Sequence, residues 1–218
     1  LNHCEDVVVA GIQVQNSPSW NIHPYFSDNL RFIDLKVLNP KVSPNTDGLD
    51  PESCKNVEIV GVYFSLGDDC IAVKAGKIYM GAKYKRPCEN LMIRQCCMRD
   101  GHGSVTIGSE MAGGVINLTV KDCLFINTDR GLRIKTRRGR GKDAIVDGIL
   151  FDNIQMDQAV LYSKILRQKT VMLQVLSSTD FRRKKSRRWL WNMFILPMMK
   201  TRSQELRPCL TELSHVQK

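Results

Sequence analysis

Four short polar motifs hold side chains that can move protons or bind anions. They are Asn45-Thr46-Asp47-Gly48, Gly67-Asp68-Asp69, Gly101-His102-Gly103 and Arg133-Ile134-Lys135. Together the motifs supply three carboxylates, one imidazole and two cations. Clustered carboxylates raise one another's pKa, so one can stay protonated while its neighbours stay ionised. Such a set suits acid–base cleavage of a substrate that is itself negatively charged.

Each motif alone has an ordinary structural explanation. Asn-Thr-Asp-Gly is a common turn sequence. Two adjacent aspartates usually lie at a solvated edge or bind calcium, and a histidine between glycines usually belongs to a loop. Arg-Ile-Lys alternates as a solvent-facing strand does. Only the joint placement of the four motifs in one repeating framework argues for a shared site.

Residues 1–158 carry such a framework, in which a polar corner is followed by alternating apolar residues. The corners fall at Asp6, Asn29, Asn56, Asn90, Asn117 and Asp147, with spacings of 23, 27, 34, 27 and 30 residues. The alternation predicts strands, and no segment of helical period separates them. Each coil can bury its apolar face only by stacking on its neighbours.

We therefore predict an all-β fold for residues 1–158, an incomplete, right-handed, single-stranded parallel β-helix. A leucine-rich horseshoe is the competing solenoid, but its LxxLxL framework is missing. Insertions between the corners explain the variable coil length. The parallel β-helix accounts for the repeat better than any fold with crossover helices.

The framework places the four polar motifs in successive coils. Counted from the corner of its own coil, the offsets are 18 for Asp47, 12 and 13 for Asp68 and Asp69, 12 for His102, and 16 and 18 for Arg133 and Lys135. We expect all of them on one sheet or at its edge. Adjacent strand residues point to opposite faces, so the two neighbouring aspartates require a bend, which Gly67 permits.

The cysteines follow the same framework. Cys4, Cys54 and Cys88 share one coil position with Ser27, and Cys96 and Cys123 share another with Asn153. Stacks of small inward residues predict buried free thiols. Cys70 adjoins the candidate site, and a disulfide with Cys96 or Cys97 is the alternative there. No spacing of histidine and cysteine indicates zinc.

The composition changes near residue 159. The net charge of +10 falls entirely within residues 159–218, and all 15 glycines precede them. The basic run Phe181–Arg188 could contact a polyanion. We instead interpret residues 159–218 as a tail without family resemblance, either frame-shifted or disordered. The longest apolar run, Trp189–Met199, is too short for a membrane span.

With its motifs NTD, GDD, GHG and RIK in this order, the sequence resembles glycoside hydrolase family 28, the polygalacturonases and their relatives. The flanking stretches SPNTDGLDPESCKNV, GDDCIAVKAGK and RDGHGSVTIGSEMAGG look like its bacterial, exo-acting branch. The resemblance covers approximately residues 1–158. Members of this family are considerably longer than this chain.

The resemblance implies hydrolysis of α-1,4-galacturonosidic bonds in pectin with inversion, and carboxyl groups about 6.5–9.5 Å apart. By motif, Asp68 is the general acid, Asp47 and Asp69 hold and deprotonate the water, and His102 assists the acid. Arg133 and Lys135 bind the substrate carboxylate, and Asn45 orients the site. No cofactor or metal is implied.

Alternative functions remain open from the sequence. One is a hydrolase of a branched pectin such as xylogalacturonan, and another is an inactive fragment that binds acidic polysaccharide. A calcium-dependent pectate lyase shares the β-helix but fits the histidine and paired acids less well. Neither nucleic acid nor a membrane is an expected partner, and we expect a monomer. A polymeric substrate favours a secreted or periplasmic full-length parent.

Overall fold

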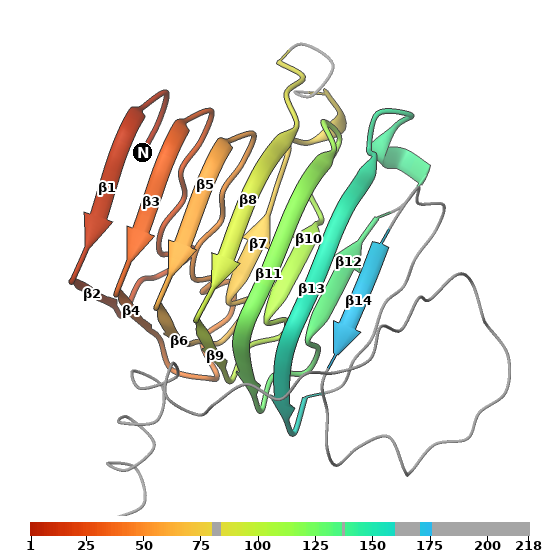
Figure 1. Ribbon diagram of the computed structural model, residues 1–218. Coiled ribbons are helices and arrows are strands. Elements are labelled where there is room, and N and C mark those ends of the chain that lie inside the picture. Colours follow the sequence, from red (N-terminus) through yellow and green to blue (C-terminus); the bar gives the residue numbers. More distant parts are fainter. Residues whose placement is uncertain (80–83, 137, 160–170, 176–218) are drawn as a thin grey trace, which may run out of the picture.

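The computed structural model describes residues 1–79, 84–136, 138–159 and 171–175. Its strands all pair in parallel and follow one another in stacked coils (Figure 1). The strands are β1 (Glu5–Ala10), β2 (Gln13–Gln15), β3 (Asp28–Ile33), β4 (Lys36–Leu38), β5 (Lys55–Val60), β6 (Tyr63–Ser65), β7 (Ile71–Val73), β8 (Cys88–Arg94), β9 (Cys97–Arg99), β10 (Val105–Gly108), β11 (Val115–Ile126), β12 (Leu132–Lys135), β13 (Val146–Asp157) and β14 (Val171–Val175), with a 3-10 helix η1 (Arg138–Arg140).

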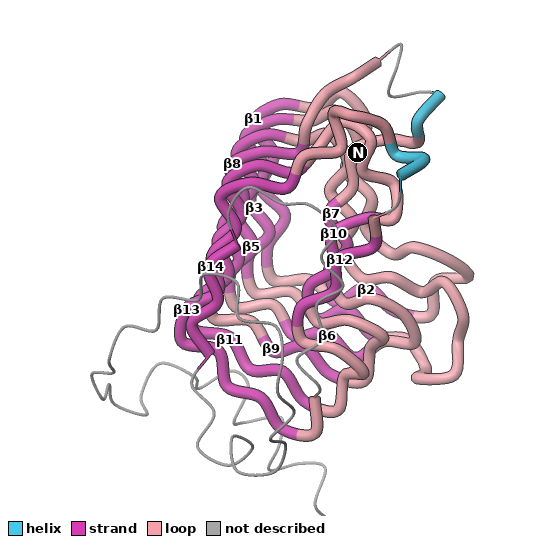
Figure 2. The backbone as a smooth tube through the Cα atoms, turned by 90° about the vertical axis from the view of Figure 1, so that its right-hand side faces the viewer, coloured by secondary structure: helices cyan, strands magenta, loops and turns pink. Residues whose placement is uncertain are grey.

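The coils form three faces around a central core, and within each face the strands run parallel to one another (Figure 2). One face runs from β1 through β3, β5, β8, β11 and β13 to β14. A second contains β2, β4, β6 and β9, and joins the first because β11 and β13 are long enough to belong to both. The third contains β7, β10 and β12. The predicted parallel β-helix is confirmed.

The polar corners form a hydrogen-bonded ladder on the outside of the first face. The side-chain amide of each corner asparagine donates a hydrogen bond to the corner side chain of the previous coil. The first such bond runs from Asn29 to Asp6 at 2.9 Å, and the last runs from Asn117 to Asn90 at 3.2 Å. Each corner residue has a positive φ of 55–57°. Asparagine tolerates this left-handed conformation better than most residues. The ladder therefore fixes both the bend and the register of successive coils.

The register of the last coil corrects two expected alignments by one residue. Leu118 pairs with Ile149, which places Gly148 rather than Asp147 opposite Asn117. Gly148 has φ +64°, and a Cβ there would lie 2.5 Å from the Asn117 Oδ1 atom. The same shift places Ile154 rather than Asn153 opposite Cys123. Glycine occupies this corner because it meets both the backbone and the space requirement.

The interior is filled by stacked apolar side chains in register. One stack runs along the first face and contains the buried residues Phe32, Ile59, Ile93, Val120 and Phe151. The cysteine stack is also as expected, because Ser27, Cys54 and Cys88 occupy equivalent positions. Cys70, Cys96 and Cys97 are buried and form no disulfide among the described residues, so the disulfide alternative for Cys70 is wrong in this structure.

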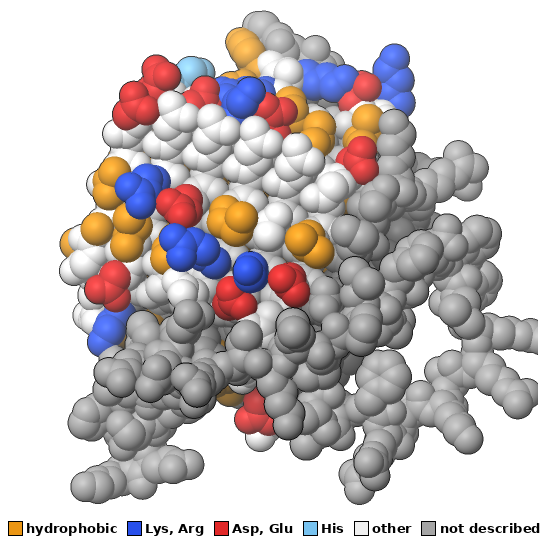
Figure 3. All heavy atoms as spheres, viewed as in Figure 1, with side chains coloured by type: hydrophobic (Ala, Val, Ile, Leu, Met, Phe, Trp, Pro, Cys, Tyr) orange, Lys and Arg blue, Asp and Glu red, His pale blue; other side chains and the backbone are white. Residues whose placement is uncertain are grey.

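The outside of the first face is mixed in character (Figure 3). Glu58 is 3.0 Å from Arg31 and 3.1 Å from Arg94, and exposed apolar side chains such as Val8 lie nearby. Within the described residues, no helix is long and apolar enough to cross a membrane. The basic run at 181–188 lies outside the described residues. So does almost all of the predicted tail, and its boundary at residue 158 stays a prediction.

Candidate active site

The candidate site lies at the edge of the third face, where strand pairing sets the position of each motif. Leu49 pairs with Ile71, Ile71 with Val105, and Val105 with Leu132. Counting back two residues from these positions brings Asp47 level with Asp69 and with Gly103. Arg133 and Lys135 lie within β12 itself. The four motifs thus meet at one edge in successive coils, as expected.

Glycines allow the coils to approach at this edge. Gly67 and Asp68 form a bend, and a Cβ on Gly67 would lie 2.1 Å from the Ser43 carbonyl oxygen. A Cβ on Gly101 would lie 2.5 Å from the Asp68 carbonyl oxygen, and one on Gly103 would lie 2.8 Å from Asp69 Oδ1. Larger residues would therefore push the chain away from the two aspartates.

Three carboxylates converge there. One oxygen each of Asp47, Asp68 and Asp69 lies within 4.8 Å of the other two. This separation is shorter than the 6.5–9.5 Å that the sequence resemblance implies, because the bend turns Asp68 and Asp69 toward the same edge. Two hydrogen bonds of about 2.8 Å that meet at a near-tetrahedral angle span about 4.6 Å. A single water can therefore bridge two of these carboxylates.

Asp69 is the fully buried member and carries two cationic partners. Arg133 Nη1 lies 3.1 Å from its Oδ1 atom, and Lys135 Nζ lies 2.5 Å from its Oδ2 atom. The side chain of Asp69 is 0% exposed, whereas those of Arg133 and Lys135 are about one quarter exposed. The two cations thus stabilise a buried carboxylate and still present charge to the surface.

Asp68 lies beside the imidazole of His102. The distance from His102 Nδ1 to Asp68 Oδ1 is 3.2 Å, and the imidazole is half exposed. The same Oδ1 atom accepts a hydrogen bond of 2.8 Å from the backbone N–H of Asp69. Asp68 is thus the most accessible of the three carboxylates and has its orientation fixed from two sides.

The environment of Asp47 disfavours its charged form. Burial and then the neighbouring Asp68 raise the pKa of Asp47 to about 6, against a lowering effect of Lys74. Asn45, two residues earlier, is exposed and has a φ of 55°. The turn between them is closed by Thr46, whose hydroxyl donates to the Ser43 carbonyl at 2.9 Å.

A buried cation beneath Asp47 was missed by sequence reasoning. Lys74 is 3% exposed and places its Nζ atom 3.9 Å from Asp47 Oδ2, 3.4 Å from Asp50 Oδ2 and 3.4 Å from Glu110 Oε2. It also lies 4.2 Å above the ring centroid of Trp20. The signal was present, because Lys74 is the one charged residue in the otherwise apolar stretch 71–75.

Asp50 is the most buried acid in this group. It is 0% exposed, and both of its carboxylate oxygens lack a hydrogen-bond partner among the described residues. Burial raises its pKa well above the usual value, and Lys74 opposes this rise. Lys74 therefore shares its single charge among three carboxyl groups.

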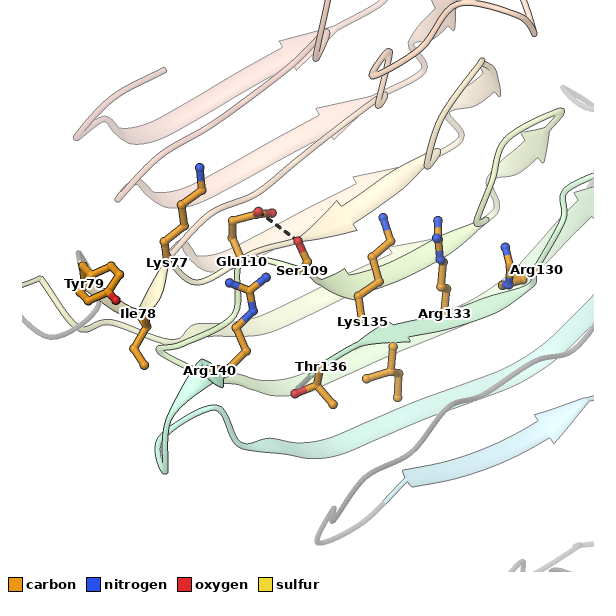
Figure 4. A pocket seen from close by; sticks show the side chains of 11 residues that line it. Lys77, Ile78, Tyr79, Ser109, Glu110, Arg130, Arg133, Lys135, Thr136 and Arg140 are labelled. Atoms are coloured by element: carbon orange, nitrogen blue, oxygen red, sulfur yellow. Dashed lines mark hydrogen bonds between the residues drawn. The ribbon is translucent and has the colours of Figure 1, made fainter. Parts of the chain in front are cut away.

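A cavity of about 720 Å³ lies next to the acids, on the side of β12 (Figure 4). Its lining includes Lys77, Arg130, Arg133, Lys135 and Arg140, and Glu110 is the one carboxylate that the described residues contribute. The acid triplet itself does not line this cavity. The acids and this cavity are thus adjacent, and Arg133 and Lys135 line the cavity while also contacting Asp69.

The carboxylate triplet could also hold a divalent cation, since oxygen ligands are what such ions prefer. However, both oxygens of Asp69 already face a cationic side chain. Binding a metal there would require these contacts to be broken or shared. The residues present fit a water between carboxylates better than a metal ion.

A parallel β-helix that carries clustered acids, an imidazole and paired cations at one sheet edge has the groups that acid–base chemistry on an anionic substrate requires. Comparison of the sequence with family models agrees, because the model described as "Glycosyl hydrolases family 28" matches residues 1–171. The chain belongs to this family.

Relatives and solved structures point the same way. The chain is 40% identical over 153 residues to a "Probable polygalacturonase" of Vitis vinifera, covering 68% of this chain and 31% of the relative. It is 36% identical over 158 residues to an "Endo-polygalacturonase" of Pectobacterium carotovorum, covering 72% and 36%. The chain thus spans about a third of the length of these curated relatives.

Among solved structures, an exopolygalacturonase from Thermotoga maritima superposes with a TM-score of 0.70 at 31% identity, covering 79% of this chain and 40% of that one. A polygalacturonase from Erwinia carotovora gives the same TM-score at 27% identity, covering 82% and 48%. These similarities support the β-helix and include relatives named for both endo and exo action.

Proposed function

We propose that this chain carries the catalytic centre of a polygalacturonase, which hydrolyses α-1,4-galacturonosidic bonds in pectin. The observation that carries the proposal is the cluster of Asp47, Asp68 and Asp69 beside Arg133 and Lys135. Membership of family 28 and the names of the relatives support the substrate class.

In this proposal Asp68 is the general acid. It is the most accessible carboxyl, and its contact with His102 holds it toward the open edge. The acid donates its proton to the glycosidic oxygen as the bond to the sugar carbon breaks.

Asp47 and Asp69 bind and deprotonate the attacking water. Their oxygens are close enough for one water to hydrogen-bond to both. Arg133 and Lys135 bind the substrate carboxylate, since a guanidinium can grip a carboxylate with two hydrogen bonds. Asn45, in the exposed turn, orients the sugar at the mouth of the site.

We propose inversion at the sugar carbon, as the family resemblance implies. The attacking oxygen then comes from water rather than from a carboxylate, and no covalent sugar–enzyme bond forms. The short separation of the carboxylates is accommodated by a water that bridges them. The new sugar end is then released as the β-anomer from an α-linked substrate.

The test is to incubate the chain with polygalacturonic acid and EDTA and to analyse the products by chromatography and NMR. We expect saturated galacturonates whose first anomer is β. The Asp68→Asn variant should release none, whereas Asp34→Asn, at an exposed corner far from the acids, should behave as the wild type. Unsaturated products, or equal activity of Asp68→Asn, would overturn the proposal. An α-anomer would overturn inversion alone.

A further inference from the structure

The three acids of the candidate site differ in what already contacts their oxygen atoms. Asp69 has a cation at hydrogen-bond distance from each oxygen, Arg133 at 3.1 Å and Lys135 at 2.5 Å. Asp68 accepts a hydrogen bond from the backbone N–H of Asp69. The buried carboxylate of Asp47 has no hydrogen bond to another side chain among the described residues. Asp47 therefore keeps its lone pairs available for a water, and its negative charge must be stabilised in another way.

Lys74 is the cation that stabilises this charge. Its side chain is buried, and its Nζ atom lies 3.9 Å from Asp47 Oδ2. This distance is too long for a hydrogen bond but short enough for a strong charge interaction at a buried position. Lys74 therefore favours the ionised form of Asp47 without occupying the oxygen atoms that a water would use.

The ammonium group of Lys74 has three further neighbours. Its Nζ atom lies 3.4 Å from Asp50 Oδ2 and 3.4 Å from Glu110 Oε2. It also lies 4.2 Å from the centroid of the Trp20 ring. In Figure 4 the carboxylate of Glu110 accepts a hydrogen bond of 3.0 Å from Ser109. These contacts hold the ammonium group in place and divide its charge among several acids.

The charges around Asp47 act on it in opposite directions. Burial and then Asp68 raise the pKa of Asp47, and Lys74 has the largest of the effects that lower it. Asp69 adds a smaller rise, and Lys135 adds a smaller lowering. Lys74 is therefore the main support for the ionised form of this carboxyl group.

Asp50 and Glu110 compete differently for the charge of Lys74. Burial raises the pKa of Asp50 well above its ordinary value, which favours its protonated form. Burial also raises the pKa of Glu110, but the opposing effects, of which Lys74 is the largest, leave it below its ordinary value. Glu110 is thus the negative charge that competes with Asp47 for Lys74 near neutral pH.

We propose that Lys74 is a positioning residue for hydrolysis, which acts through Asp47 by keeping this carboxylate ionised and its oxygen atoms free for the attacking water. Glu110 sets how much of the lysine charge reaches Asp47. This inference rests on the proposed function. It assigns a role in the reaction to a side chain that is buried beneath the site.

The test compares pH profiles of kcat/KM on polygalacturonate. Lys74→Gln should move the acidic limb to higher pH by about one unit or more, because Asp47 loses its nearest cation. Glu110→Gln should move the limb to lower pH by about 0.5 unit, because Lys74 loses a competing carboxylate. Glu110→Gln, at a partly exposed position, keeps the test decisive should Lys74→Gln fail to fold.

The pH at which activity is lost separates this role from a structural one. Without Lys74 the buried acids repel one another most when they are ionised, so loss of the fold would reduce activity more at pH 8 than at pH 5. Loss of the positioning role would reduce activity more at pH 5, because Asp47 is then protonated. The matched controls are Lys55→Gln and Glu89→Gln, which break a 2.7 Å ion pair on the first face and should move the limb by less than about 0.2 unit.

A carbon-13 NMR titration of the Asp47 carboxyl group makes the outcome independent of turnover. An acidic limb that stays in place in the folded variants, or that moves in the same direction in both, would overturn the inference. A wild-type chain that hydrolyses polygalacturonate, with an Asp47 titration that neither variant changes, would overturn the role of Lys74 alone. Titrations that shift as expected in a chain without hydrolytic activity would overturn the proposed function and leave the effect of Lys74 on Asp47 intact.

Discussion

His102 is joined to Asp68 twice, through the side chain and through the backbone. Its Nδ1 atom lies 3.2 Å from Asp68 Oδ1, and its N–H donates to the Asp68 carbonyl at 3.2 Å. The backbone link persists whatever residue occupies position 102. A substitution there therefore changes the chemistry of the site while the coil register is retained.

We expect His102→Gln to lower kcat by 10²-fold or more with little change in stability, because the acid loses its ionisable neighbour. Steady-state kinetics on polygalacturonate and a thermal melt check this expectation. His3→Gln, at an exposed histidine in the first coil, is the control and should match the wild type. A comparable kcat in both variants would exclude a role for the imidazole.

Asp47 should set the acidic limit of activity. Its pKa is raised to about 6, and the water-activating role needs the ionised form. Activity should therefore fall as the pH drops through about 6. Loss of this limb in a pH profile of kcat/KM, with activity maintained at pH 4.5, would contradict the assignment of Asp47.

The same shift predicts a trade-off between activity and stability. Because the pKa of Asp47 is raised on folding, the folded state binds the proton more tightly than the unfolded state does. The stability that this proton binding contributes is complete below the ordinary pKa of 3.8 and is lost as the pH rises through about 6. Two pH units correspond to about 3 kcal/mol. Asp47→Asn should thus be inactive. In urea at pH 8, its free energy of unfolding should exceed that of the wild type by about 1–3 kcal/mol. Equal stability at pH 5 and pH 8 in the wild type would refute the shift.

Arg133→Gln and Lys135→Gln should each raise KM for polygalacturonate by about 10-fold or more, because each loses a charged contact to the substrate carboxylate. Since both cations also neutralise buried Asp69, each variant should lose more stability between pH 5 and pH 8 than the wild type does. Lys121→Gln on β11 serves as the exposed control. Unaltered KM in both variants would place substrate recognition elsewhere.

Lys74→Met should destabilise the fold by about 3–5 kcal/mol at pH 8, since three carboxyl groups lose their shared cation. Adding Asp50→Asn should restore part of this loss, because it removes one of the uncompensated acids. Urea unfolding of the single and double variants measures both effects. Lys55→Met, at an exposed pair with Glu89, is the control. A Lys74→Met variant as stable as the wild type would show that the cluster is neutralised in another way.

The sequence predicts the solenoid well because its information is periodic. The Asn29–Asn117 corners need a left-handed residue and a side-chain amide, so they are visible as a repeat. The last corner was misplaced at Asp147 because the corner can also be a glycine, as Gly148 is. Aligning the neighbouring polar residue, Asp147, with the other corners then shifts the later positions of this coil by one residue.

The candidate site was predictable where several polar motifs fall into one register. Asp47, Asp68 and His102 stand out against the apolar alternation. Lys74 also interrupts an apolar stretch, but neither its burial nor that of Asp50 is apparent until Leu49 pairs with Ile71.

The stacked construction also has a consequence for how the protein comes apart. Coils of a solenoid contact only their neighbours, so unwinding proceeds from an end. Loss of the coil that carries β12 would remove Arg133 and Lys135 while the three aspartates of earlier coils stayed together. Asp69 would then be a buried carboxylate with no counter-charge. Fraying from the side of β12 would thus remove the two cations that we propose to bind substrate before it separated the acids, and would leave the buried carboxylates without these counter-charges.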